Sequence, residues 1–111
     1  GVYWLEHPMI ETRVEAYRRL CRELRIAVCS PEHAPGGPFT RAVWVLRGAS
    51  DMSRIDVGYG GITGSYKHAM LCQAFGIKCE MHGGHWTNSH ILGATQPQAA
   101  RLTLADASGR R

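Results

Sequence analysis

The sequence lacks long apolar runs, since no stretch approaches the ~18 consecutive apolar residues of a membrane-spanning helix. It also lacks the charged and apolar regions of a secretory signal peptide. None of the four cysteines, Cys21, Cys29, Cys72 and Cys79, is spaced as CxxC from another, and each lies in an apolar segment. These absences predict a cytoplasmic protein with buried free thiols and no membrane partner.

A basic surface stripe with interleaved aromatic residues is also missing, although the formal net charge is +4. The arginines between residues 13 and 25 alternate with Glu15 and Glu23. This pattern is typical of the solvated face of a helix with ion pairs one turn apart. We therefore expect no nucleic-acid partner.

What the sequence does contain is a repeat of about 25 residues, in which short apolar runs alternate with amphipathic segments. The apolar runs predict strands buried on both faces, and the amphipathic segments predict helices. Such alternation favours right-handed βαβ units and a parallel sheet, either part of a barrel or an open flavodoxin-like sheet. Strands are predicted at residues 2–5, 26–29, 53–57 and 77–81, with a weaker one at 102–104, and helices at 11–24, 38–46, 66–75 and 88–95.

Ionisable residues follow the predicted strands, with one at or near the end of each of the first four. In a parallel βα barrel these ends form one rim, where active sites are built. Each residue alone has an ordinary explanation as a helix cap or a loop side chain. Together, two carboxylates, an aspartate and a histidine have the composition of a metal site beside an acid/base pair; they are Glu6, Glu32, Asp56 and His82.

Four segments resemble the mandelate racemase and muconate-lactonizing branch of the enolase superfamily. Residues 4–8, Trp-Leu-Glu-His-Pro, are similar to the Trp-Ile/Leu-Glu-Glu/Gln-Pro end of its fourth barrel strand. Residues 60–64, Gly-Gly-Ile-Thr-Gly, resemble the loop after its sixth strand. Residues 74–84 resemble a helix end followed by the histidine-bearing seventh strand, and residues 89–95 continue the similarity in the same order.

The resemblance implies a partial (β/α)₈ TIM barrel, covering roughly strands 4 to 8 of the enolase-superfamily barrel. Residues 1–95 would form the C-terminal half of this barrel, and residues 96–111 a divergent tail with one weak last strand. Because the chain opens directly on a strand, and five strands cannot close such a barrel, we expect a fragment of a longer protein. Alone, it should be inactive or need a partner to complete the sheet.

The resemblance also implies roles. Glu6 and Glu32 would be two of three carboxylate ligands of Mg²⁺, which prefers hard oxygen donors. His82 would be the general acid/base, and Asp56 would orient its imidazole. The parent, expected to be a homo-oligomer, would remove the proton α to the carboxylate of an acid sugar or 2-hydroxy acid and expel water. Racemisation or cycloisomerisation within the same superfamily is the alternative.

Several positions depart from the pattern. His7 replaces the usual second acid, and Glu32 lies in Ser-Pro-Glu-His where the branch has Gly-Glu. Asp56 precedes the glycine pair by four positions instead of five, which questions its role as the dyad acid. Asp106 could replace the acid of the last strand, and residues 83–86 are predicted to line the pocket.

Three other hypotheses remain open from the sequence alone. Cys79, His82, His85 and His90 could form a zinc site, although they lack the paired spacing of a structural site. The chain could be a non-catalytic half-barrel that dimerises. The glycines of residues 58–61 could hold a nucleotide or flavin, although they lack the GxGxxG spacing.

Overall fold

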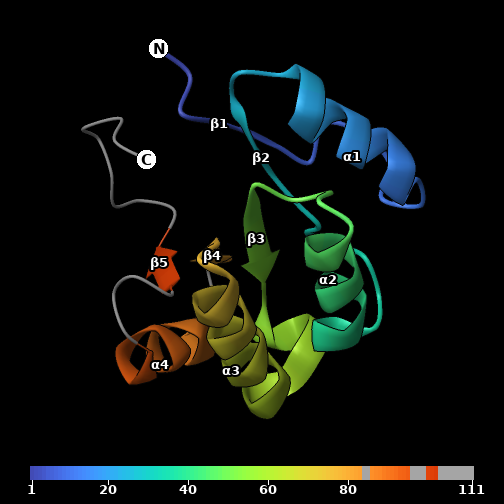
Figure 1. Cartoon of the computed structure of the whole chain (residues 1–111). Helices are drawn as coiled ribbons and strands as arrows, with labels where there is room; N and C mark the ends of the chain where they lie inside the picture. Colours follow the sequence, from blue (N-terminus) through green and yellow to red (C-terminus); the bar gives the residue numbers. More distant parts are fainter. Residues whose placement is uncertain (84–85, 96–99, 103–111) are drawn as a thin grey trace.

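The computed structural model describes residues 1–83, 86–95 and 100–102. Strands and helices alternate along the chain, as the repeat predicted (Figure 1). The elements are β1 (Trp4–Glu6), α1 (Val14–Glu23), β2 (Ala27–Cys29), α2 (Gly37–Leu46), β3 (Met52–Ile55), α3 (Val57–Phe75), β4 (Lys78–Met81), α4 (Trp86–Ala94) and β5 (Ala100–Leu102).

The five strands form one parallel sheet in the order β1-β2-β3-β4-β5. Because spatial order follows sequence order, right-handed crossovers place every helix on the same side of the sheet. Consistently, α2 packs against α3, and α3 against α4. A doubly wound open sheet needs a reversal of strand order, which the described strands do not show. The predicted partial (β/α) barrel is therefore confirmed, and the flavodoxin-like alternative is wrong.

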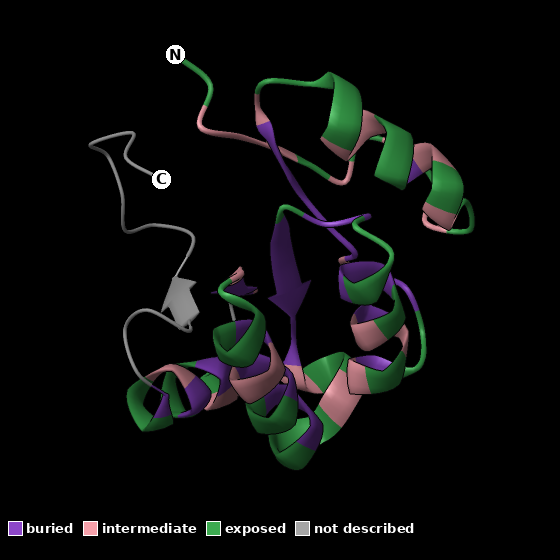
Figure 2. Ribbon diagram, in the orientation of Figure 1, coloured by how far each residue is buried: buried purple, intermediate pink, exposed green. Residues whose placement is uncertain are grey.

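The core lies between the sheet and its helices. Around β3, β4 and α3, the buried cluster contains Ile55, Ala69, Cys72, Cys79, Met81 and Ile91. A second cluster joins α1, β2 and α2, where the rings of Tyr17 and Trp44 meet edge to face at 4.7 Å. Figure 2 shows β3 buried along its length, as expected for a strand covered on both faces.

Helix α3 begins nine residues earlier than the predicted start at residue 66, at Val57. The Asp56 carboxylate caps it by accepting the N–H of Gly58 at 2.8 Å. Gly61, with φ 63° and ψ 179°, then interrupts the helix after its first turn. Glycine's low helix propensity hid this turn from sequence analysis. Gly64 allows α2 to approach, because a Cβ there would lie 3.1 Å from Pro38 Cδ.

Other boundaries differ less. Strand β5 lies at Ala100–Leu102, two residues before the predicted 102–104, of which residues 103 and 104 lie outside the described part. All four cysteines are free; three are buried, and Cys21 is half-buried. None of the described helices is long and apolar enough to cross a bilayer.

Candidate acid–base and metal site

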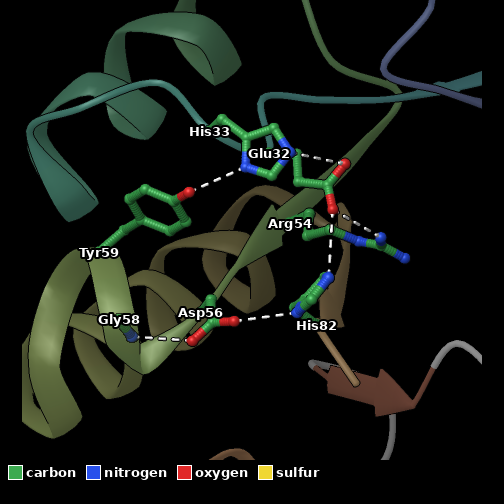
Figure 3. Close-up of a pocket in the computed structure, with 7 residues that line it drawn as sticks. All are labelled: Glu32, His33, Arg54, Asp56, Gly58, Tyr59 and His82. Carbon is green, nitrogen blue, oxygen red and sulfur yellow. Dashed lines mark hydrogen bonds and ion pairs between the residues drawn. The ribbon is translucent and has the colours of Figure 1, made fainter. Parts of the chain in front are cut away.

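The four strand-end residues predicted from the sequence lie at one edge of the sheet. Glu6 ends β1, Asp56 directly follows β3, His82 directly follows β4, and Glu32 lies three residues after β2. Since the strands are parallel, their carboxyl ends meet at the same rim. The predicted convergence is present, and Figure 3 shows three of these side chains pointing toward one another.

His82 lies between two carboxylates. Its Nδ1 is 3.0 Å from Asp56 Oδ2, and its Nε2 is 3.3 Å from Glu32 Oε1. The other oxygen of Asp56 accepts the Gly58 N–H, which fixes the orientation of the carboxylate. Both carboxylates only accept, and His82 presents one ring nitrogen to each of them, Nδ1 to Asp56 and Nε2 to Glu32. Asp56 thus lies beside His82 although it precedes the glycine pair at residues 60 and 61 by four positions instead of five.

Arg54 is a site residue that the sequence analysis missed. Its guanidinium is buried, and Nη1 contacts Glu6 Oε1 and lies 3.6 Å from Glu32 Oε1. A signal for it existed: Arg54 is two residues before Asp56, and alternate residues of a strand share a face. Arg54 compensates two carboxylates that would otherwise repel each other in a partly buried place.

The donor set suits Mg²⁺ in its chemistry. Glu6 and Glu32 offer hard carboxylate oxygens, and both reach a single cationic nitrogen of Arg54. Two carboxylates that converge on one cation can also converge on another. A metal here would share these carboxylates with Arg54, or displace its guanidinium from them.

Glu11 holds the loop that carries Glu32. Its buried carboxylate accepts the backbone N–H groups of Glu32, His33 and Ala34, the last two at 2.7 Å. It also lies 2.9 Å from Nδ1 of His7, in the loop after β1. Sequence analysis could not find the contacts of Glu11 with residues 32–34, because these residues are more than 20 positions away and no local pattern links them.

Arg41 of α2 donates hydrogen bonds to the backbone of the same rim. It is fully buried and donates to the carbonyl oxygens of Glu32 at 2.8 Å and Arg54 at 2.6 Å. It also donates to the carbonyls of Ala34 and Gly37. Burial lowers the pKa of this guanidinium from its ordinary value. One side chain thus connects α2, the loop after β2 and the end of β3.

The rim encloses a pocket of about 400 Å³, within the range of small-molecule sites. Its described lining is Glu32, His33, Arg54, Asp56, Gly58, Tyr59 and His82 (Figure 3). This lining lacks Gly83 and Trp86, which were predicted to contribute, whereas residues 84–85 and Asp106 lie outside the described part.

The proposed zinc set is not assembled among the described residues. Cys79 lies instead in the core with His68 and Cys72, and His90 is exposed on α4; His85 is outside the described part. His68 Nε2 lies 3.4 Å from Cys72 Sγ. A hydrogen bond from Cys79 lowers the pKa of the Cys72 thiol to about 5, and the pKa of Cys79 is raised in turn.

Comparison with known proteins identifies related domains. The sequence model of the family described as enolase C-terminal domain-like matches residues 1–107. Among solved structures, D-glucarate dehydratase from Agrobacterium tumefaciens complexed with magnesium has 40% identity and a TM-score of 0.86, over 92% of this chain and 26% of that chain.

Two further structures share the fold at lower identity. An enolase from the alpha proteobacterium BAL199 with bound magnesium has 23% identity and a TM-score of 0.80, over 96% of this chain and 30% of its own. A mandelate racemase/muconate lactonizing enzyme from Polaromonas sp. JS666 has 21% identity and a TM-score of 0.77, over 91% of this chain and 28% of that chain. The chain thus spans less than a third of each of these three proteins.

Proposed function

Because this chain belongs to the enolase C-terminal domain-like family, we propose that it supplies part of the active site of a Mg²⁺-dependent acid-sugar dehydratase. The family assignment confirms the resemblance inferred from the sequence, and the related proteins support an enzyme as the parent. Dehydration is favoured over racemisation by the 40% identity to a D-glucarate dehydratase, against 21% to the mandelate racemase/muconate lactonizing enzyme.

The observation that carries the proposal is the placement of His82 between Asp56 and Glu32 at the rim pocket. A carboxylate beside one nitrogen of a histidine restricts the orientation of the ring. Its other nitrogen then faces the pocket, where a proton can be exchanged with a substrate. Asp56 therefore acts by positioning His82, and His82 acts as the general acid/base.

Glu6 and Glu32 would hold the metal. When bound, Mg²⁺ supplies positive charge that stabilises a substrate carboxylate as its α-proton is lost. His82 then moves a proton at Nε2: it takes the α-proton, or it gives a proton to the departing β-hydroxyl, which leaves as water. The pocket of about 400 Å³ has room for a six-carbon acid sugar at this rim.

The test follows D-glucarate by proton NMR in D₂O with Mg²⁺, in the protein to which this chain contributes. His82→Ala should lower kcat by about 10²–10⁴-fold with a smaller change in KM. His90→Ala, an exposed histidine on α4, is the matched control and should leave turnover unchanged. Wild-type turnover in His82→Ala, or exchange of the α-proton without loss of water, would contradict the dehydratase proposal.

A further inference from the structure

A second group of potential ligands lies next to the rim pocket. One ligand atom from each of His7, Glu32 and His33 lies within 4.8 Å of the others. We propose that this group, the His–Glu–His triad, binds a transition-metal dication such as Zn²⁺. The inference does not depend on the proposed dehydratase function, although the two sites share Glu32.

His7 is prepared for coordination by its backbone and its partner. Its φ of 43° lies in the left-handed region, where no other described non-glycine residue is found, and such conformations concentrate at functional sites. Nδ1 lies 2.9 Å from Glu11 Oε1. Since a carboxylate only accepts, His7 donates from Nδ1, and the lone pair stays on Nε2. This carboxylate–histidine arrangement is the usual support of a metal-binding imidazole.

His33 is oriented in the same way by a different partner. Its Nδ1 lies 2.8 Å from the hydroxyl of Tyr59, so that Nε2 is the nitrogen that turns toward Glu32 Oε2, 3.8 Å away (Figure 3). The two imidazoles lie edge to face, with their centroids 5.1 Å apart. In both histidines Nδ1 already has a partner, so Nε2 is the nitrogen left for a metal.

The two oxygens of Glu32 face different sites. Oε1 lies near His82 and Arg54, and Oε2 lies near His33. Two imidazole nitrogens and one carboxylate oxygen suit zinc and other transition metals, whereas Mg²⁺ prefers oxygen ligands alone. The His33 side chain is 55% exposed, so an ion can reach the triad from solvent. The chemistry therefore separates this site from the proposed Mg²⁺ site despite the shared carboxylate.

Titration of the full chain with Zn²⁺ or Mg²⁺, each followed by calorimetry, tests the proposal. Zn²⁺ should bind in one equivalent, and His7→Ala and His33→Ala should each weaken its binding at least about tenfold, with a smaller effect on Mg²⁺ binding. Tyr59→Phe, which removes only the partner of His33 Nδ1, should weaken Zn²⁺ binding about tenfold. His90→Ala is the control, and circular dichroism checks that each variant is folded.

NMR of the histidine ring nitrogens gives a readout that is independent of affinity. Without metal, His7 should show the tautomer with hydrogen on Nδ1, and Zn²⁺ should shift the Nε2 signals of His7 and His33. The proposal is overturned if the Zn²⁺ affinity is unchanged in both histidine variants, or if Zn²⁺ shifts His68 instead. If the wild-type chain binds Zn²⁺ but not Mg²⁺, the proposed function is rejected and the zinc site is not.

Discussion

At the scale of single residues, Arg54 determines the charge balance of the rim. Its buried guanidinium contacts the carboxylates of Glu6 and Glu32, and removal of one partner from a buried ion pair costs more than the pair contributes. The same two carboxylates are the predicted metal ligands. Arg54 and a metal ion would therefore compensate the same negative charge.

We expect Arg54→Gln to lower the free energy of unfolding by about 3 kcal/mol in EDTA, with part of the loss restored by Mg²⁺. Urea denaturation with and without Mg²⁺ measures both effects. Arg18→Gln, which removes an exposed ion pair with Glu15, should change stability by less than about 0.5 kcal/mol. An identical loss for Arg54→Gln with and without Mg²⁺ would show that the two cations do not share these carboxylates.

A second prediction concerns the buried pair Cys72 and Cys79. Because the pKa of Cys72 is lowered to about 5 from the ordinary 9.0, its thiolate stabilises the folded state most at alkaline pH, and this contribution is lost as pH falls through about 5. Ultraviolet thiolate absorbance should therefore be present at neutral pH and disappear in acid.

Cys72→Ala should abolish this absorbance. Cys29→Ala should leave it unchanged, because burial raises the pKa of Cys29 to about 12 and keeps it a neutral thiol. A neutral-pH spectrum that is the same in wild type and Cys72→Ala would be inconsistent with the lowered pKa.

The strand-end residues could be predicted because strand periodicity locates a rim and parallel strands share it. Glu6, Glu32, Asp56 and His82 were all found in this way, and the structure brings them together; their roles stay predictions. Arg54 was available from the same periodicity but was not identified. Residues that act through the backbone of distant loops have no local signal, because only the fold makes them neighbours.

At the scale of elements, Arg41 makes α2 a support for the site. It donates to four backbone carbonyl groups, two of them in Glu32 and Arg54. The apolar positions Phe39, Ala42, Val43 and Leu46 predicted the helix. Phe39, Val43 and Leu46 are exposed, however, and the buried face carries Arg41 and Trp44 instead. The sequence pattern also did not reveal the first turn of α3, which depends on the Asp56 cap rather than on helix propensity.

Arg41→Met should lower the free energy of unfolding by about 3 kcal/mol and weaken Mg²⁺ binding, because several buried carbonyls lose their donor and Glu32 loses its support. Denaturation and Mg²⁺ titration measure the two effects. The matched control is Arg47→Met at the C-cap of the same helix, where the arginine is exposed and pairs with Glu15 at 3.6 Å. Equal behaviour of the two variants would argue against a supporting role for Arg41.

At the scale of the whole molecule, the sheet has two ends. Among the described strands, β1 pairs only with β2, and β5 only with β4. Strand edges of this kind pair readily with another chain. Large apolar side chains are also exposed, including Phe39 at 82% and Trp86 at 90%. The chain therefore presents surfaces suited to association.

We expect the isolated chain to associate as its concentration rises. Sedimentation velocity should show an increasing average sedimentation coefficient, because edge pairing and burial of apolar side chains both favour contact. A dimer that is indifferent to Mg²⁺ would support the non-catalytic half-barrel hypothesis. A monomer at every concentration would mean that these edges and side chains are not sufficient for association.

The proposed function requires that Glu6 and Glu32 bind Mg²⁺ while His82 remains available for proton transfer. Calorimetric titration of the chain with Mg²⁺ tests it most directly. Glu6→Gln and Glu32→Gln should each weaken binding by at least about tenfold, and His82→Ala should leave it nearly unchanged. Mg²⁺ affinity that survives both glutamine substitutions, or that disappears in His82→Ala, would contradict the claim.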